Sequence, residues 1–303
     1  MTTEQTQNAP GGTATLAGRT VARIGFGAMQ LAAMRPGRPA PDRDTALAVL
    51  RSAVGQGVNH IDTAQFYGAG ACNELIRDAL HPYPHDLVLV SKVGVDDSGH
   101  SLVPAQRPEQ LRAGVEANLA SLRTEQLAVV NMRRLDAPPG LRAEGDQLVD
   151  LDSQLAELIK LRDEGKIGAI GLSNVSPGQL RHALPAGIAC VQNAYSVLDR
   201  SSEPVLALCR EHGLAWVPFW PLGSGGFPGV ARVTDHPAVV AAAASLGATP
   251  AQAGLAWQLA HYPHTLLIPG TTSQAHLHDN IAAGGLRLPP GTLATLDRLA
   301  PAA

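Results

Sequence analysis

The sequence predicts an α/β protein that folds as a single (β/α)8 TIM barrel with a short N-terminal hairpin. Its length of 303 residues lies within the range of one barrel domain. Between about residues 21 and 285, eight short apolar runs alternate with amphipathic helical stretches. Several runs are apolar at successive positions, as in the segment 87–90 (LVLV). Because this pattern is typical of strands buried on both faces of a parallel sheet, the eight strand–helix pairs predict a barrel.

The predicted strands are spaced so that a helix fits after each one. In chain order they are Val21–Gly25, Val58–Thr63, Leu87–Val93, Leu127–Met132, Ala169–Ser173, Ala189–Gln192, Ala215–Phe219 and Thr265–Ile268. An open, doubly wound sheet is the alternative. It is disfavoured because the segment 25–30 (GFGAMQ) lacks the third glycine of a GxGxxG loop and no helix start follows it.

The remaining elements follow from turn signals and apolar periodicity. The stretch 13–21 (TATLAGRTV), with Gly18 at a turn, predicts a small hairpin over the barrel bottom. Asp44 and Ser273 are predicted to cap helices, and Gly57 to end the first of them. Apolar stripes at spacings of three and four predict helices around residues 47–54, 111–122, 148–161, 277–281 and 293–299.

Composition limits the class of protein. Residues 1–12 are polar, with no secretory signal pattern, and we expect a disordered leader; residues 13–303 form one barrel domain without a linker. The net charge of −3 gives no basic surface for nucleic acid or for a membrane. The three cysteines are far apart and the histidines follow no metal-ligand spacing, so we expect no metal and a cytoplasmic location. The oligomeric state stays open.

Reactive side chains follow the predicted strands, where barrel enzymes hold their chemistry. Asp62 ends the second strand, Tyr67 follows it in a loop, Lys92 lies in the third and Arg133 follows the fourth. Taken singly, Asp62 is equally a turn residue and Tyr67 a core or surface residue. Lys92 is harder to dismiss, because a lysine in an apolar strand is almost never buried without a partner.

Together these side chains predict proton chemistry. A nearby ammonium favours the phenolate and lowers the pKa of a tyrosine, and a carboxylate holds the ammonium in place. Such a tyrosine protonates an oxyanion as it forms, which is what hydride transfer to a carbonyl requires. Since no amino acid carries hydride, a nicotinamide cofactor is expected.

Several segments resemble the aldo-keto reductase family in the right order along nearly the whole chain. They are 57–68 (GVNHIDTAQFYG), 91–93 (SKV), 167–174 (IGAIGLSN) and 268–271 (IPGT) followed by Asn280. The resemblance implies an NADP(H)-dependent reductase on a (β/α)8 barrel. Tyr67 would be its proton donor, supported by Lys92 and Asp62.

The resemblance also implies which residues hold the cofactor. Ser173, Asn174 and Gln192 would bind the nicotinamide carboxamide, and Phe219 would stack on its ring. The implied cofactor-binding residues in full are Gly27, Met29, Asp62, Ser173, Asn174, Gln192, Phe219, Trp220, Leu222, Ser224, Gly270, Thr271, Thr272, Ser273, His276, Asp279 and Asn280. The helix N-terminus and hydroxyls near residues 270–273 suit a phosphate. Lysine and arginine, frequent there in the family, are absent, so NADPH is expected and NADH stays possible.

Arg133 is the main departure from the family pattern, which usually places a histidine there to hydrogen-bond the substrate carbonyl. Arginine is also a donor and is always charged. It would hold the carbonyl oxygen, bind an anionic substrate group, or form a salt bridge away from the site. The leading hypothesis is reduction of an aldehyde or ketone by NADPH.

Two other hypotheses stay open. One is a nicotinamide-binding regulatory or redox-sensing module with little turnover. The other is a lyase or isomerase barrel that uses Lys92 as a Schiff base. The retained Asp62, Tyr67 and Lys92 favour the reductase over both.

Overall fold

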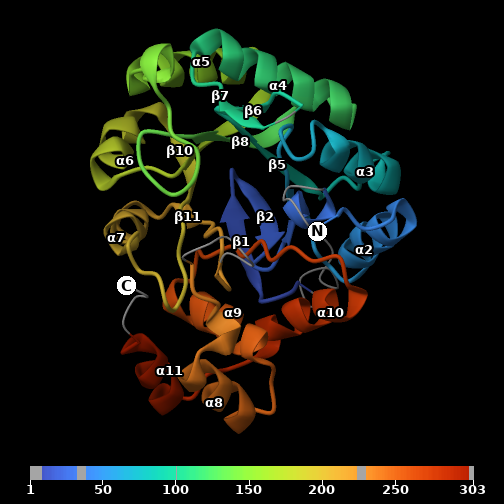
Figure 1. The fold of residues 1–303 in the computed structure, drawn as a ribbon, viewed down its shortest axis with the longest axis vertical. Coiled ribbons are helices and arrows are strands. Elements are labelled where there is room, and N and C mark those ends of the chain that lie inside the picture. The colour runs from blue at the N-terminus through green and yellow to red at the C-terminus, as the bar shows by residue number, and fades with distance from the viewer. Residues whose placement is uncertain (1–8, 33–38, 100, 224–229, 300–303) are drawn as a thin grey trace.

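The computed structural model describes residues 9–32, 39–99, 101–223 and 230–299, which form a barrel of parallel strands surrounded by helices (Figure 1). The strand order is β11-β10-β9-β8-β5-β4-β3, with every neighbouring pair parallel. The strands are β3 (Phe26–Gly27), β4 (His60–Asp62), β5 (Val88–Val93), β8 (Leu127–Arg133), β9 (Ile167–Ser173), β10 (Ile188–Gln192) and β11 (Ala215–Trp216). This order excludes the doubly wound alternative.

The predicted eighth strand, residues 265–268, closes the barrel through isolated bridges. Thr265 bridges Trp216 on one edge of the sheet, and Leu267 bridges Ile24 on the other. Backbone hydrogen bonds accompany both contacts, from Leu266 N to Trp216 O at 2.8 Å and from Gly25 N to Leu267 O at 2.8 Å. The α/β barrel prediction is therefore confirmed. The segment 265–268, which joins the two edges of the sheet, does so through a few backbone contacts.

The prediction of Val21–Gly25 as the first barrel strand is right only in its second half. Residues 19–22 belong to β2 (Arg19–Ala22), which pairs with β1 (Thr13–Leu16) in an antiparallel hairpin. The barrel contacts begin at Ile24, and the first barrel strand continues into β3. Arg23 is the one charged residue between Val21 and Phe26, and the change from hairpin to barrel falls at this residue. The prediction joined the apolar residues on its two sides into a single strand.

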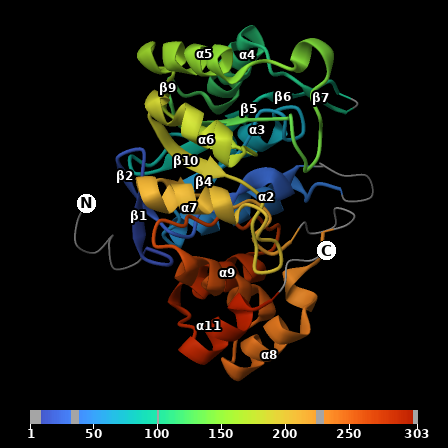
Figure 2. The same cartoon turned by 90° about the vertical axis from the view of Figure 1, so that its left-hand side faces the viewer.

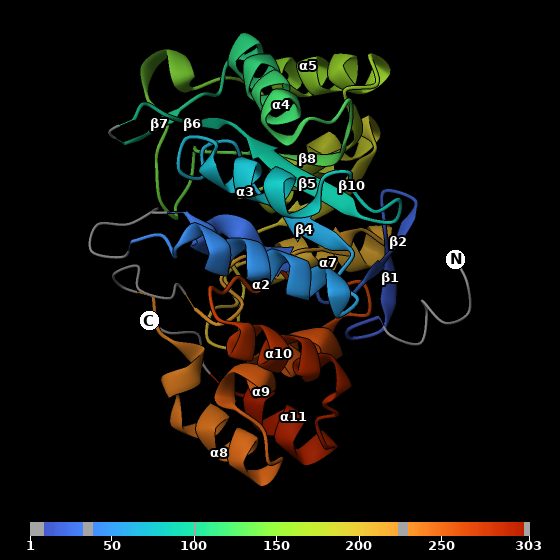
Figure 3. The ribbon, with the colours of Figure 1, turned by 90° about the vertical axis from the view of Figure 1, so that its right-hand side faces the viewer.

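The predicted hairpin itself is present and closes one end of the barrel (Figures 2 and 3). Ala17 and Gly18 form its two-residue turn, both with positive φ, a backbone conformation that glycine adopts without strain. Leu16 and Val21 are buried against the apolar residues inside the barrel, including Val88 and Val129. The hairpin thus fills the barrel bottom.

The residues just before the hairpin are tied to the barrel. Arg23 N donates to Gly12 O at 2.9 Å and Ile24 N donates to Pro10 O at 3.0 Å. Of the predicted leader 1–12, residues 1–8 lie outside the described residues.

Helices cover the outside of the strands. They are α2 (Arg43–Gly55), α3 (Ala71–Leu80), α4 (Pro108–Leu122), α5 (Leu151–Asp163), α6 (Pro177–Ala183), α7 (Glu203–His212), α8 (Pro237–Ser245), α9 (Pro250–His261), α10 (Gln274–Ala282) and α11 (Pro290–Asp297). The helices α8 and α11 lie outside the ring, beyond α9 (Figures 1 and 2). A second hairpin, of β6 (Val95–Asp97) and β7 (Leu102–Pro104), follows β5 at the end opposite β1–β2 and was not predicted.

The helix starts differ in part from the prediction. Ser273 caps α10 as expected, accepting from His276 N at 3.4 Å. The cap of α2 is Asp42 rather than Asp44, because Asp42 Oδ1 accepts from Thr45 N at 2.8 Å. The helix α5 starts at Leu151, so Leu148, which is 63% exposed, is not part of its apolar stripe.

Within the described residues, no single helix is long and apolar enough to cross a membrane. The helices α8 and α9 meet the length and composition criteria only together, and they are bent by 90° relative to each other. In the fold α9 has an almost fully buried row of residues that packs against the barrel.

Gly27 and Gly270 bring the first strand and the closing segment into close contact. A Cβ atom on Gly27 would lie 2.5 Å from Ile268 O, and one on Gly270 would lie 2.4 Å from Gly27 O.

We expect Gly27→Ala to lower the free energy of unfolding by about 1–3 kcal/mol, since the backbone where these two segments meet would have to move. Urea denaturation measures this loss.

Gly55→Ala is the matched control, because a Cβ there meets nothing within 4 Å and alanine favours the helix. A Gly27→Ala protein as stable as the Gly55→Ala protein would contradict the close contact.

Candidate active site

Three of the side chains singled out from the sequence gather at the carboxyl ends of neighbouring strands. Asp62 ends β4, Lys92 lies near the end of β5 opposite Asn131 of β8, and Arg133 ends β8 opposite Ser173 of β9. Parallel pairing in this register carries them to one end of the barrel.

Asp62 and Lys92 form a buried ion pair. Their side chains are only 4% and 7% exposed, and Lys92 Nζ contacts Asp62 Oδ1 directly. Lys92 Nζ also donates to Thr63 O at 3.0 Å, and Gln192 Nε2 donates to the other Asp62 oxygen at 2.7 Å. These bonds fix both charges, which a buried pair needs to offset the loss of hydration.

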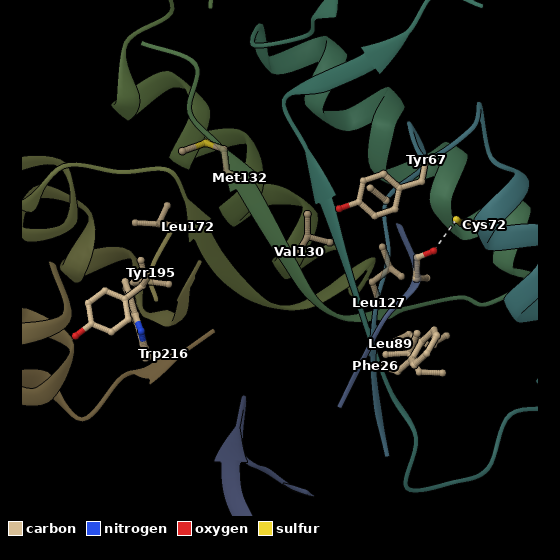
Figure 4. Packing of buried hydrophobic residues seen from close by; sticks show 14 of the residues in the cluster. Phe26, Tyr67, Cys72, Leu89, Leu127, Val130, Met132, Leu172, Tyr195 and Trp216 are labelled. Carbon is tan, nitrogen blue, oxygen red and sulfur yellow. Dashed lines mark hydrogen bonds between the residues drawn. The ribbon is translucent and has the colours of Figure 1, made fainter. Parts of the chain in front are cut away.

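Tyr67 lies beside this pair. Its ring packs edge-on against Phe66 at a centroid distance of 5.1 Å, and Lys92 Nζ is 4.9 Å from the Tyr67 ring centroid. Figure 4 shows Tyr67 within the apolar cluster, its hydroxyl pointing away from the Cys72 thiol, which donates to Ala28 O at 3.1 Å. The phenol, the ammonium and the carboxylate are thus assembled as the sequence predicted.

The expected lowering of the Tyr67 pKa is wrong in its net direction. Burial of the phenol raises the pKa of Tyr67, and the positive charges of Lys92 and Arg133 offset only part of this increase. The nearby Asp62 carboxylate raises it further. Desolvation outweighs the ammonium because the site is closed by apolar side chains, which a sequence does not reveal.

Lys92 is held as a cation. Burial alone would lower the pKa of Lys92, but the Asp62 carboxylate and the Tyr67 phenol raise it above its usual value. A Schiff-base lysine has to lose its proton to act as a nucleophile. The geometry therefore disfavours the lyase or isomerase hypothesis.

Arg133 faces the same site without a carboxylate partner among the described residues. Its Nη1 donates to Ser173 Oγ at 3.4 Å and its Nη2 donates to Pro139 O at 3.2 Å. Its guanidinium carbon lies 5.1 Å from the Phe219 ring centroid. The salt bridge away from the site, one of the three alternatives, does not form in this part of the chain.

The residues expected at the nicotinamide lie around Arg133. Asn174 N donates to Gln192 O at 2.9 Å, which joins the ends of β9 and β10. Asn174 adopts a left-handed backbone, and its Nδ2 donates to Arg134 O and Ala137 O. The Asn174 amide nitrogen therefore holds the loop after β8, a role not predicted.

One of the residues expected at the nicotinamide has an acceptor atom that suits a carboxamide. Gln192 Oε1 is buried and has no hydrogen-bond partner among the described residues. Such an acceptor needs an N–H donor, which a nicotinamide carboxamide supplies. Gln192 would thus bind the cofactor through Oε1 while its Nε2 holds Asp62.

The predicted phosphate end has local partners of its own. Ser273 N donates to Thr271 Oγ1 at 3.1 Å, and Ser273 Oγ caps α10. Both hydroxyls still have a proton to donate to an anion at this helix N-terminus. Gly27 and Gly270 are explained by the closure of the barrel without any cofactor.

The other predicted cofactor residues lie at the same barrel end or on α10. For Met29, Leu222, Thr272, His276, Asp279 and Asn280, no hydrogen bond or ion pair within the described ranges leads to Asp62, Tyr67, Lys92 or Arg133. His276 is exposed, Asn280 is buried, and Trp220 contacts the Phe219 ring edge-on at 5.3 Å. Of the remaining ones, Met29, Leu222, Thr272 and Asp279 are partly exposed, and Ser224 lies outside the described residues.

Sequence reasoning missed the buried polar residues behind the ion pair. Thr63 supplies a carbonyl to Lys92, and Ser91 precedes Lys92 in the strand. The run 91–92 (SK) inside an apolar strand is a signal for them, but their partners lie on distant helices. Within the described ranges, no group of three His, Cys, Asp or Glu side chains is placed to hold a metal ion.

Comparison with known proteins agrees with this geometry. The profile of the Aldo/keto reductase family matches residues 23–301. The chain is 43% identical to pyridoxine 4-dehydrogenase of Escherichia coli over 94% of its length and 97% of that protein. It is 30% identical to an uncharacterized oxidoreductase of Schizosaccharomyces pombe, covering 94% of this chain and 89% of that one.

A solved aldo-keto reductase of Klebsiella pneumoniae in complex with NADPH is also similar. It is 27% identical, with a TM-score of 0.76 over 94% of this chain and 93% of that one. These matches define the class, an oxidoreductase built on a (β/α)8 barrel. The chain belongs to the aldo/keto reductase family.

Replacing Lys92 tests the ion pair. We expect Lys92→Met to lower the free energy of unfolding by about 3–5 kcal/mol, because it leaves the Asp62 carboxylate buried without a counter-ion. Adding Asp62→Asn to it should restore part of the loss. Denaturation of the two variants in urea at neutral pH measures both effects.

The pH dependence follows from the raised Lys92 pKa. A raised folded-state pKa contributes stability below the unfolded pKa of about 10, and this is lost as pH rises through the folded value.

A double variant no more stable than Lys92→Met would contradict the pairing.

Proposed function

We propose that this protein reduces an aldehyde or ketone to an alcohol with NADPH, with Tyr67 as the general acid. The observation that carries the proposal is the Tyr67 phenol placed 4.9 Å, measured to its ring centroid, from an ammonium that is itself paired with Asp62. Membership of the aldo/keto reductase family supports the same reaction class.

The chain's own residues provide the proton and the charge balance. The bound nicotinamide supplies the hydride to the carbonyl carbon. The Tyr67 hydroxyl donates its proton to the carbonyl oxygen, where negative charge develops, and Lys92 stabilises the phenolate that remains. A raised pKa keeps Tyr67 protonated at neutral pH, and transfer stays favourable because an alkoxide is a far stronger base than a phenolate.

Arg133 is proposed to donate to the same carbonyl oxygen. Its positive charge also lowers the pKa of Tyr67 in part, which places the two side chains in one electrostatic site. Arg133 would stabilise the developing oxyanion in place of the family's histidine.

NADPH is the proposed cofactor. Two solved neighbours from Klebsiella pneumoniae, 27% and 28% identical, were crystallised with NADPH and with NADP. The unpartnered Gln192 Oε1 suits the carboxamide, and the α10 N-terminus with Thr271 and Ser273 suits a phosphate. Because residues 270–282 contain no lysine or arginine to mark a 2′-phosphate, NADH belongs in the same binding titration.

The substrate is proposed to be a small carbonyl compound. The Escherichia coli relative is named for oxidation of pyridoxine, so pyridoxal belongs in the panel beside activated aromatic aldehydes. No turnover across the panel, with NADPH demonstrably bound, would count against the proposed function and favour a regulatory nicotinamide-binding module.

Tyr67→Phe tests the proton donor. We expect turnover to fall by at least about 10²-fold, because the ring keeps its packing but has no proton to give. NADPH consumption followed by absorbance measures turnover, and fluorescence titration measures NADPH binding, which should persist. Unchanged turnover would refute the role of Tyr67.

Arg133→Met tests the oxyanion donor. We expect kcat to fall by about 10²-fold, since the carbonyl oxygen loses a charged hydrogen-bond donor. Arg133→His should retain more activity than Arg133→Met, because imidazole also donates. A large increase of turnover in Arg133→His would instead favour the regulatory module.

A further inference from the structure

A buried polar network lies behind the Asp62–Lys92 pair. It consists of Thr63, Asn73, Ser91 and Asn118, all of them fully buried, and is called the Asn73 network here. Thr63 Oγ1 donates to Asn73 Oδ1 at 2.8 Å, and Asn73 Nδ2 donates to Asn118 Oδ1 at 2.9 Å. Ser91 Oγ donates to the same Asn118 oxygen at 2.6 Å.

This network runs from the residue after Asp62 to the residue before Lys92. It passes through α3, which carries Asn73, and α4, which carries Asn118. Asn118 Nδ2 donates to Gly114 O at 2.7 Å, so the orientation of that amide is set by α4 itself. Two outer helices are thereby connected to the two strands that carry the charges.

Packing alone does not require such a network. A buried amide costs free energy unless its hydrogen bonds are made, and an apolar side chain of the same size would fill the space. What the amides add is direction, because each bond needs a particular orientation of donor and acceptor. The network therefore determines how the Thr63 and Ser91 segments face each other.

The Thr63 segment in turn determines where the ammonium lies. Besides its contact with Asp62, Lys92 Nζ donates to Thr63 O at 3.0 Å. A lysine side chain is a flexible stem with a compact charge at its tip, so its acceptors set its position. From that position Nζ faces the Tyr67 ring.

We propose that Asn73 is a positioning residue for proton transfer by Tyr67: through Thr63 and Asn118 it holds the Lys92 ammonium beside the phenol. The inference rests on the proposed carbonyl reduction. Asn73 touches neither substrate nor cofactor in this scheme and acts only through the ion pair.

Asn73→Leu is the decisive variant, because leucine has nearly the same size and no hydrogen-bonding group. A displaced ammonium lowers the pKa of Tyr67 less, so the phenol is a weaker acid with a higher pKa. We expect kcat to fall about tenfold, and the alkaline limb of the kcat–pH profile to move to higher pH. The NADPH dissociation constant should stay within about twofold, since the cofactor residues are elsewhere.

Ser121→Ala is the matched control. Ser121 Oγ accepts from Asn73 Nδ2 at 3.0 Å and donates to Gln65 Oε1 at 2.7 Å. Without it, Asn73 keeps its bonds with Thr63 and Asn118, which form the path toward Lys92. The loss of Ser121 Oγ should reduce stability without moving the pH profile. An equal shift of the profile in Ser121→Ala and Asn73→Leu would overturn the proposal, because a general loosening would then explain both.

Thr63→Val is the second variant, for the case in which Asn73→Leu does not fold. It removes one hydroxyl and leaves the carbonyl that Lys92 uses, and we expect the same upward shift of the alkaline limb. Where both fold, the double variant should lose no more kcat than Asn73→Leu alone, since both act along one path. Fully additive losses would overturn the proposal.

The two hypotheses fail differently. A wild-type protein that binds NADPH but turns over no carbonyl would refute the proposed function. An active wild type whose pH profile is unchanged by Asn73→Leu and by Thr63→Val would refute only the role of Asn73.

Discussion

The buried ion pair between Asp62 and Lys92 is the interaction on which the rest of the site depends. A lysine in the middle of an apolar strand has no water to stabilise it, so the fold has to supply a carboxylate and a carbonyl within hydrogen-bonding distance. Asp62 supplies the carboxylate and Thr63 the carbonyl, and Gln192 holds the carboxylate by donating to its other oxygen. The pair thereby couples three strands that lie far apart in sequence.

Two opposing effects act on Tyr67, and their balance defines its chemistry. Burial disfavours the phenolate, whereas the charges of Lys92 and Arg133 favour it, and burial has the larger effect before any ligand is bound. A phenol in this state keeps its proton until a stronger base is formed beside it. The apolar surroundings of Tyr67 therefore keep the phenol protonated until negative charge develops on the substrate oxygen. The same surroundings strengthen the electrostatic effect of the Lys92 ammonium, because the local dielectric constant is low.

The general architecture and the central charges were predictable because they depend on local patterns. Successive apolar residues such as 87–90 mark a strand buried on both faces, and a polar residue inside or at the end of such a strand stands out, as Lys92 and Asp62 do. Strand boundaries were less predictable. The chain from Val21 to Phe26 is apolar except at Arg23, and its two halves belong to a hairpin and to the barrel.

Side-chain contacts between segments far apart in the chain could not be predicted from the sequence. Nothing near Asn73 in the sequence indicates that its amide meets Asn118, and nothing near Gln192 indicates a bond to Asp62. The net pKa of Tyr67 belongs to the same group, because it depends on how completely other segments exclude water. All the cofactor residues transferred by family resemblance stay a prediction, which the buried, unpartnered Gln192 Oε1 supports at one position.

The plugged lower end of the barrel has a kinetic consequence. Leu16 and Val21 are buried in the apolar cluster inside the barrel, and the β1–β2 hairpin that carries them covers that end (Figure 2). Ligands therefore reach the charged residues from the opposite end, where the strands finish. Under the proposed function, the dinucleotide cofactor and the small carbonyl substrate then reach the site from the same end of the barrel. Each ligand bound at that end then narrows the access of the other, so cofactor exchange and substrate exchange are coupled by the shape of the fold.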